Sequence, residues 1–249
     1  MKRDYVTHYS GWLNRDMHIL VHGDRGLPVL VFPTQDSMCT NFEDFGMIDT
    51  LWDYIESRQI QLFTVDTVDK ESWSDDWGNA EHRSQMQENY YHYIVDEAVP
   101  FLHAYSQSDR LPLAVGCSLG ATHASIVALR RPDLFAGCIA MSGIYDATYF
   151  TGGWMDGRWY DNSPVHFLQN MPLDHPYIHE YSQRSLIFCV GQGAWEDEGI
   201  RTLREMERIF REKGIEAWTD FWGYDVNHDW DWWQKQIRYF LPIALHTTT

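Results

Sequence analysis

Short apolar runs recur along the chain and are separated by longer stretches rich in helix formers or turn residues. The run at 27–32 reads LPVLVF and is apolar throughout, which is typical of a strand covered on both faces of a parallel sheet. Two segments of more alternating character precede it. Together these patterns predict strands at about 5–12, 16–22, 28–32, 61–65, 113–115, 138–141, 185–190 and 218–222.

Helical patterns fill most of the intervals between these strands. They are expected at about 45–58, 80–105, 121–131 and 197–213, with a last helix that starts near Asp229. Antiparallel strands followed by repeated strand–helix units predict an α/β protein with a mostly parallel central sheet and helices on both faces. The stretch 145–182 is aromatic and has no clear period, so it is interpreted as a small cap insertion in a single domain that spans residues 1–249.

The chain carries a formal net charge of −17. An acidic surface repels phosphate backbones and anionic lipids, so nucleic acid and membrane surfaces are disfavoured as partners. No apolar window is long enough to span a bilayer, and the N-terminal residues MKRDY do not begin a signal peptide. The sequence therefore predicts a cytoplasmic protein, and it leaves homo-oligomerisation open.

The cysteines are scattered singly, at Cys39, Cys117, Cys138 and Cys189. Neither a Cys pair nor a Cys/His cluster has the spacing of a zinc or redox site, and three of the four lie in segments expected to be buried strands. A buried free thiol packs as a small apolar group. No metal and no organic cofactor is predicted.

The strongest motif is Gly-x-Ser-x-Gly at 116–120, which reads GCSLG. It follows an apolar strand and opens a segment of helix formers, which is the context of a nucleophile elbow. Such a turn places a serine hydroxyl at the carboxyl edge of the sheet, and its glycines avoid collisions with neighbouring backbone. Ser118 is therefore the predicted nucleophile. His123, further along the same helix, is assigned a packing or hydrogen-bonding role.

A serine nucleophile needs a histidine base and a carboxylate that orients it, in the chain order Ser, acid, His in this fold. His228 follows the last predicted strand and is the predicted base; the other histidines after the elbow fall in the cap, on the helix or at the C-terminus. The acid is expected after the strand at 185–190, in the sequence GQGAWEDE. Glu196 is favoured, with Asp197 as the alternative and Asp146 as a third candidate.

The oxyanion hole of such a site needs two backbone N–H groups. Leu119, the residue after the nucleophile, supplies one, and Gln35 or Thr34 in the loop after the third strand supplies the other. The chain also has 12 Trp residues, which indicate either large core side chains or an aromatic substrate cleft. In the cap, Trp154 and Trp159 are weak substrate-binding candidates, together with Tyr160 and Asn162.

Several segments carry a resemblance to a known family: GCSLGATH at 116–123, RPDLF at 131–135, MSG at 141–143 and NHDW at 227–230. They resemble the Putative esterase family of α/β-hydrolases, which includes esterase D (S-formylglutathione hydrolase) and the antigen 85 mycolyltransferases. The resemblance runs from about residue 15 to 242. In the oxyanion loop, Pro33-Thr34 replaces the family's usual His-Gly or Asp-Gly.

The resemblance implies an α/β-hydrolase fold, with Ser118 as nucleophile, His228 as base and Glu196 as acid. The function that follows is a serine carboxylesterase that cleaves small acyl esters through an acyl-enzyme. Two alternatives stay open. The same three residues could serve an acyltransferase or a thioesterase, or the chain could be a catalytically silent binding protein of the hydrolase fold.

Overall fold

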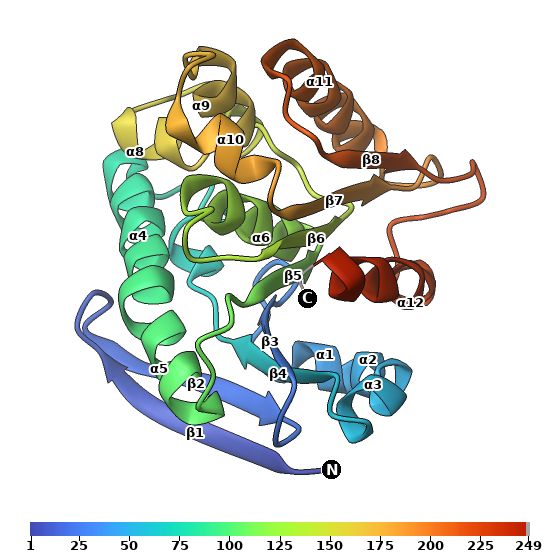
Figure 1. Cartoon of the computed structure of the whole chain (residues 1–249). Coiled ribbons are helices and arrows are strands. Elements are labelled where there is room, and N and C mark those ends of the chain that lie inside the picture. Colours follow the sequence, from blue (N-terminus) through green and yellow to red (C-terminus); the bar gives the residue numbers. More distant parts are fainter. Residues whose placement is uncertain (248–249) are drawn as a thin grey trace.

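One sheet of eight strands runs through the computed structural model, which describes residues 1–247 (Figure 1). The strands are β1 (Arg3–Ser10), β2 (Arg15–His22), β3 (Leu27–Phe32), β4 (Ile60–Val65), β5 (Leu113–Cys117), β6 (Gly137–Met141), β7 (Ser185–Val190) and β8 (Trp218–Phe221). Their order across the sheet is β1-β2-β4-β3-β5-β6-β7-β8. Strands β1, β2 and β4 pair antiparallel, and all other neighbours pair parallel. The fold is that of the α/β-hydrolases, as the sequence predicts.

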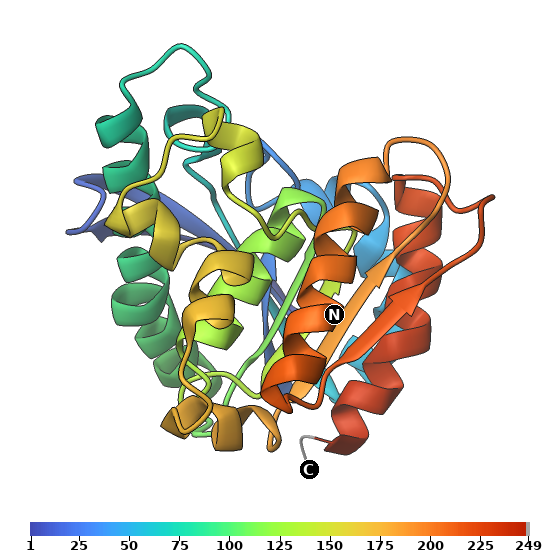
Figure 2. The same cartoon turned by 90° about the horizontal axis from the view of Figure 1, so that it is seen from above.

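Helices cover both faces of the sheet (Figures 1 and 2). One face carries α4 (Ala80–His92), α5 (Val99–Ser106), α6 (Leu119–Arg130), α9 (Pro164–Asn170) and α11 (Asp197–Lys213). The other face carries α1 (Asn41–Asp44), α2 (Met47–Thr50), α3 (Trp52–Glu56) and α12 (Trp230–Thr247). Each face has its own apolar core, because successive side chains of a strand point to opposite faces. Thus Leu30 packs with the first group and Val29 with the second.

The structure differs from the sequence prediction mainly in its helices. The segment expected as one helix at 45–58 forms two short helices, α2 and α3, and Gly46, with φ of 72°, separates α2 from α1, which precedes the expected segment. The long helix expected at 80–105 contains a π-helical segment, Tyr93–Ala98, just before Pro100. A proline ring lacks the N–H that a regular helix needs, and such positions are where helices shift register.

The cap stretch 145–182 is more ordered than its sequence suggests. It forms α7 (Thr148–Thr151), α8 (Gly157–Asp161), α9 and α10 (Pro176–Tyr181), all of which are short. All four cysteines are buried and free. Among the described residues, no helix combines the length and the apolar character needed to cross a membrane.

Phe188 on β7 offers a test of the larger core. Its side chain is fully buried and lies 5.4 Å from the ring of Tyr145 and 5.3 Å from that of Phe210. We expect Phe188→Ala to lower the free energy of unfolding by about 3–5 kcal/mol, because it leaves a cavity in a packed interior. Chemical denaturation measures this change. Trp77→Ala is the control: Trp77 is 99% exposed, and a change of more than about 0.5 kcal/mol there would argue against this description of the core.

Candidate active site

The polar residues of interest gather at the carboxyl edge of the sheet, where parallel strands end together. Ser118 follows β5 directly and Ser142 follows β6 directly. Glu196 is the residue before α11, and His228 lies between β8 and α12. This edge is where open α/β sheets place their ligand sites, so the topology brings residues far apart in sequence to one place.

The turn at Ser118 is tight and strained. Its backbone has φ of 56° and ψ of −129°, a conformation that L-residues rarely adopt. A Cβ on Gly116 would lie 2.1 Å from the carbonyl oxygen of Gly120, and one on Gly120 would lie 2.3 Å from that of Phe32. Both glycines are therefore required by backbone contacts. The Ser118 N–H donates to the carbonyl of Met141 (2.9 Å), which holds the turn against β6.

The structure brings Ser118, His228 and Glu196 into one hydrogen-bonded chain. Ser118 Oγ lies 2.8 Å from His228 Nε2, and His228 Nδ1 lies 3.1 Å from Glu196 Oε2. The loop carrying His228 is fixed to the Glu196 loop, since the His228 N–H donates to the carbonyl of Ala194 (3.0 Å). Glu196 is 1% exposed, whereas the His228 side chain is partly open to solvent.

Two further residues hold Glu196, and sequence reasoning assigned neither a role. Ser142 Oγ donates to Glu196 Oε1 (2.6 Å) and accepts from the indole N–H of Trp233 (3.0 Å). The Trp233 ring also meets the His228 ring edge-on, with centroids 4.9 Å apart. The sequence signals for Ser142 were its place directly after a strand, which it shares with Ser118, and its position in the segment MSG at 141–143 that resembles the family.

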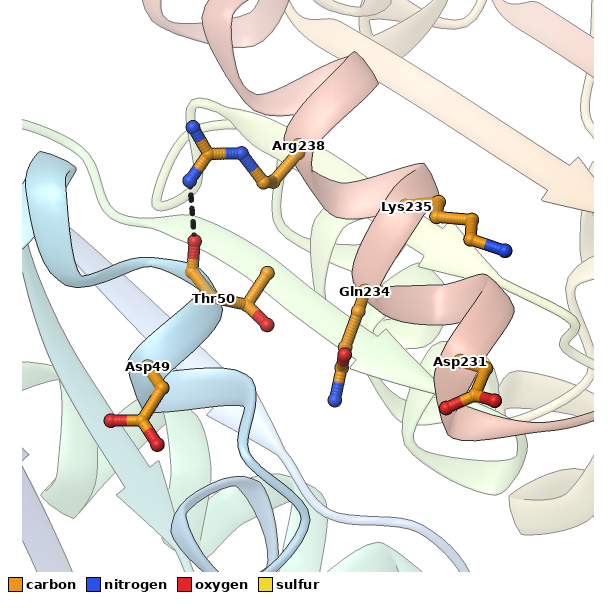
Figure 3. Close-up of a pocket in the computed structure, with 6 residues that line it drawn as sticks. All are labelled: Asp49, Thr50, Asp231, Gln234, Lys235 and Arg238. Carbon is orange, nitrogen blue, oxygen red and sulfur yellow. Dashed lines mark hydrogen bonds between the residues drawn. The ribbon is translucent and has the colours of Figure 1, made fainter.

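Helix α12 carries Trp233 and is anchored on the outer surface. The Arg238 guanidinium donates to the carbonyl of Thr50 (2.7 Å), as Figure 3 shows, and pairs with Asp53 (2.9 Å). The amide of Gln234 donates to the carbonyl of Phe45 (2.9 Å). These contacts border a surface hollow of about 380 Å³ between α2 and α12, away from Ser118.

The other candidate acids lie apart from His228. Asp197 is exposed in the first turn of α11. Asp146 accepts from the N–H of Thr148 (2.9 Å) and pairs with Arg201 (3.3 Å). Burial alone would raise the pKa of Asp146, but the hydrogen bonds from Thr148, together with the nearby His166 and Arg201, outweigh it and the pKa is lowered. Of the three carboxylates considered, Glu196 is the one in contact with the imidazole.

Hydrogen bonding in the loop after β3 distinguishes the two candidate donors of an oxyanion hole in that loop, Thr34 and Gln35. The Thr34 N–H is engaged by Asn41 Oδ1 (3.0 Å), and the Asp36 N–H by Asp69 Oδ2 (3.2 Å). Among the described residues, no acceptor engages the Gln35 N–H. Leu119 is the first residue of α6, so its N–H has no partner within that helix.

A cavity of about 340 Å³ opens above Ser118. Its lining combines the polar residues of the site with apolar and aromatic side chains: Gln35, Ser118, Leu119, Thr122, Ser142, Ile144, Tyr149, Phe150, Trp195 and His228. No Asp, Glu, Lys or Arg is among these described lining residues. In residues 1–247, no group of three or more His, Cys, Asp and Glu side chains is arranged to hold a metal ion.

The aromatic residues at this cavity are not the ones expected from sequence. Trp159 is 0% exposed and packs edge-on against Trp73 at 4.6 Å, so it is a core residue. Trp154 is partly exposed but is not part of the described lining, and Asn162 is buried in a hydrogen bond with Gln87 (3.0 Å). The cap contributes Tyr149 and Phe150 instead.

Comparison with known proteins places the chain among esterases. A family model described as Putative esterase matches residues 10–242. No curated protein sequence matches the chain. Three similar solved structures cover nearly the whole chain at low identity. A ferulic acid esterase has 17% identity and a TM-score of 0.76, covering 99% of this chain and 98% of its own.

The other two structures belong to the relatives named above. An S-formylglutathione hydrolase from Agrobacterium tumefaciens has 12% identity and a TM-score of 0.75, with 100% of this chain and 99% of that chain covered. MPT51 of Mycobacterium tuberculosis has 14% identity and a TM-score of 0.77, with 100% of both chains covered. At these identities the similarity demonstrates a shared fold.

The close approach at Gly120 gives a test of the strained turn. We expect Gly120→Ala to destabilise the protein by at least about 2 kcal/mol, because the new methyl group would force the β3 backbone away from α6. The melting temperature and the denaturation midpoint report this loss. Gly157→Ala is the matched control: a Cβ there meets nothing within 4 Å, so its effect should stay within about 0.5 kcal/mol. Equal effects at both glycines would mean that the contact of Gly120 with the β3 backbone does not limit the side chain at this position.

Proposed function

The chain belongs to the Putative esterase family, and we propose that it is a serine carboxylesterase in which Ser118 is the nucleophile, His228 the base and Glu196 the acid. The observation that carries this proposal is the short contact between Ser118 Oγ and His228 Nε2 (2.8 Å), backed by a buried carboxylate. A serine hydroxyl is a weak nucleophile until a neighbouring base can take its proton.

The reaction proceeds in two steps, acylation of Ser118 and hydrolysis of the acyl-enzyme. Ser118 Oγ bonds to the ester carbonyl carbon while His228 Nε2 takes the hydroxyl proton, and His228 then gives that proton to the departing alcohol. Water then attacks the acyl carbon while His228 Nε2 takes one of its protons; as the bond from the acyl carbon to Ser118 Oγ breaks, His228 returns that proton to Oγ, which releases the carboxylic acid and restores the hydroxyl. Glu196 holds the Nδ1–H of His228, so that Nε2 faces the hydroxyl throughout.

The developing oxyanion is stabilised by the N–H groups of Leu119 and Gln35. Both residues line the cavity, and within residues 1–247 neither N–H is engaged by an acceptor. Preorganised donors of this kind are commonly the largest single contribution to acyl transfer. Because the lining carries no formal charge apart from what His228 gains, the cavity suits uncharged acyl groups of modest size.

An acyltransferase or a thioesterase would use the same three residues. What separates these activities is the acceptor or the leaving group, so product analysis with competing alcohols and with acyl thioesters distinguishes them. The contact between Ser118 and His228 favours a catalytic protein over a binding protein, because binding alone does not require a base beside the hydroxyl.

Ser118→Ala should abolish hydrolysis of p-nitrophenyl acetate, with a loss of at least roughly 10⁴-fold in kcat, because it removes the hydroxyl that is hydrogen-bonded to His228 Nε2. A fluorophosphonate probe should label the wild type at Ser118 and leave the variant unlabelled. Ser57→Ala, before β4 at the opposite edge of the sheet, is the control and should remain active. Persisting hydrolysis in a folded Ser118→Ala variant would refute the assignment.

The choice of acid has a matched pair of variants. Glu196→Gln removes the charge that orients and stabilises the imidazole and should lower kcat by roughly 10²–10⁴-fold. Asp197→Asn changes the neighbouring carboxylate, which is exposed and does not contact His228, and should leave kcat within about twofold. Steady-state kinetics on both variants decides; the reverse order of effects would assign the role to Asp197.

A further inference from the structure

A buried histidine–aspartate pair lies beside the loop that carries Gln35, and the proposed reaction does not use it. His123 Nε2 is 2.9 Å from Asp69 Oδ1, and both side chains are almost completely buried. Aromatic rings pack around the imidazole, with Tyr90 edge-on at 5.0 Å. Removing two such groups from water is costly, and a buried pair is weak evidence for stability by itself. Its connections indicate a different role.

Asp69 connects to the Gln35 turn from two sides. Its second oxygen, Oδ2, accepts from the N–H of Asp36 (3.2 Å), a residue with φ of 61°. Its backbone carbonyl accepts from the N–H of Ser74 (2.9 Å), and the hydroxyl of Ser74 accepts from the side-chain amide of Gln35 (2.8 Å). The peptide after Gln35 and the Gln35 side chain are therefore both tied to Asp69.

His123 ties the same assembly to the nucleophile. It lies on α6, the helix that begins at Leu119 directly after Ser118 and is buried over nearly its whole length. The pair thus links the helix that supplies one oxyanion donor to the loop that supplies the other. Preorganised donors lose effect when they move, and misplacement by about 1 Å can cost roughly 10²-fold in rate.

We propose that His123 and Asp69 are positioning residues that fix the Gln35 N–H relative to Ser118 and Leu119. The inference rests on the proposed function, because only acyl transfer would place an oxyanion between these donors. Neither residue lines the cavity, so both act through the loop and the helix that they join.

The test uses Asp69→Asn and His123→Gln, with Ser74→Ala as a milder third variant. Ser74→Ala removes only the side-chain link to Gln35, so it should fold even if the buried variants do not. Hydrolysis of p-nitrophenyl acetate is measured for each variant, and so is inhibition by an alkyl trifluoromethyl ketone. The Ser118 hydroxyl attacks the carbonyl carbon of this ketone, and the product carries a tetrahedral oxyanion. The pH–rate profile is recorded as well.

We expect kcat to fall roughly 10- to 100-fold in the two buried variants, less than the roughly 10²–10³-fold typical of losing a donor outright. Ser74→Ala should lose severalfold. KM should stay within about twofold, and the ketone should bind more weakly in proportion to kcat. The rise of the rate with pH, which reports the deprotonation of His228, should stay at the same pH, because the contact between Glu196 and His228 is unchanged in these variants.

Glu88→Gln is the matched control, since Glu88 pairs with Arg130 at the far end of the same helix (2.7 Å). It should lose stability while its kcat and ketone affinity stay at wild-type values. Unchanged ketone affinity in folded variants, or an equal loss in Glu88→Gln, would overturn the positioning role while leaving the esterase intact. A wild type that neither hydrolyses esters nor reacts with fluorophosphonate would instead overturn the proposed function and this inference with it.

Discussion

The positive-φ backbone of Ser118 is the constraint on which the rest of this structure depends. Residues held in sparsely populated conformations cost on the order of 1–3 kcal/mol and persist only where their surroundings enforce them. Here the enforcement comes from a buried strand before the turn, a buried helix after it and glycines that let α6 approach β3 closely. As a result, the Ser118 hydroxyl lies between the end of β5 and the start of α6, within hydrogen-bond distance of His228.

The next strand ends in the same way. The Ser118 N–H donates to the carbonyl of Met141 on β6, and the Ser142 N–H donates to that of Cys189 on β7 (2.8 Å). Both serines then turn to positive φ, at 56° and 59°. One turn presents its hydroxyl to His228, and the other presents its hydroxyl to Glu196. Two neighbouring turns of one kind thereby set both ends of the Ser118–His228–Glu196 chain.

What the sequence predicted well was local or followed from topology. The strand at 185–190 and the helix at 197–213 are found as expected, because a six-residue apolar run is too short for a typical helix and the segment that follows has the length and period of an amphipathic helix. The sequence also located the residues that the structure brings together at the carboxyl edge of the sheet. It pointed to Ser118 because a strained turn requires glycines on both sides, and to His228 and Glu196 because chain order in this fold places such residues after the last strands.

The errors arose where tertiary contacts decide. Trp154 and Trp159 were chosen because they lie in the cap, yet composition does not say which aromatic residues of a cap point inward, and Tyr149 and Trp195 line the cavity instead. The partnership of Trp233 with Ser142 joins residues distant in sequence, so no spacing rule reveals it. The same holds for the contact between Asp69 and Asp36.

Two carboxylates of this region, those of Glu196 and Asp69, are buried, and each is tolerated because its oxygens are hydrogen-bonded. Glu196 is held by Ser142, His228 and the N–H of Gly191 (3.3 Å), and Asp69 by His123 and the N–H of Asp36. If either carboxylate lost one of these hydrogen bonds, its burial would destabilise the folded protein. Because neither carboxylate is part of the cavity lining, a reacting ester meets oriented dipoles there rather than a fixed negative charge. An acidic protein can thus offer a neutral site to its substrate.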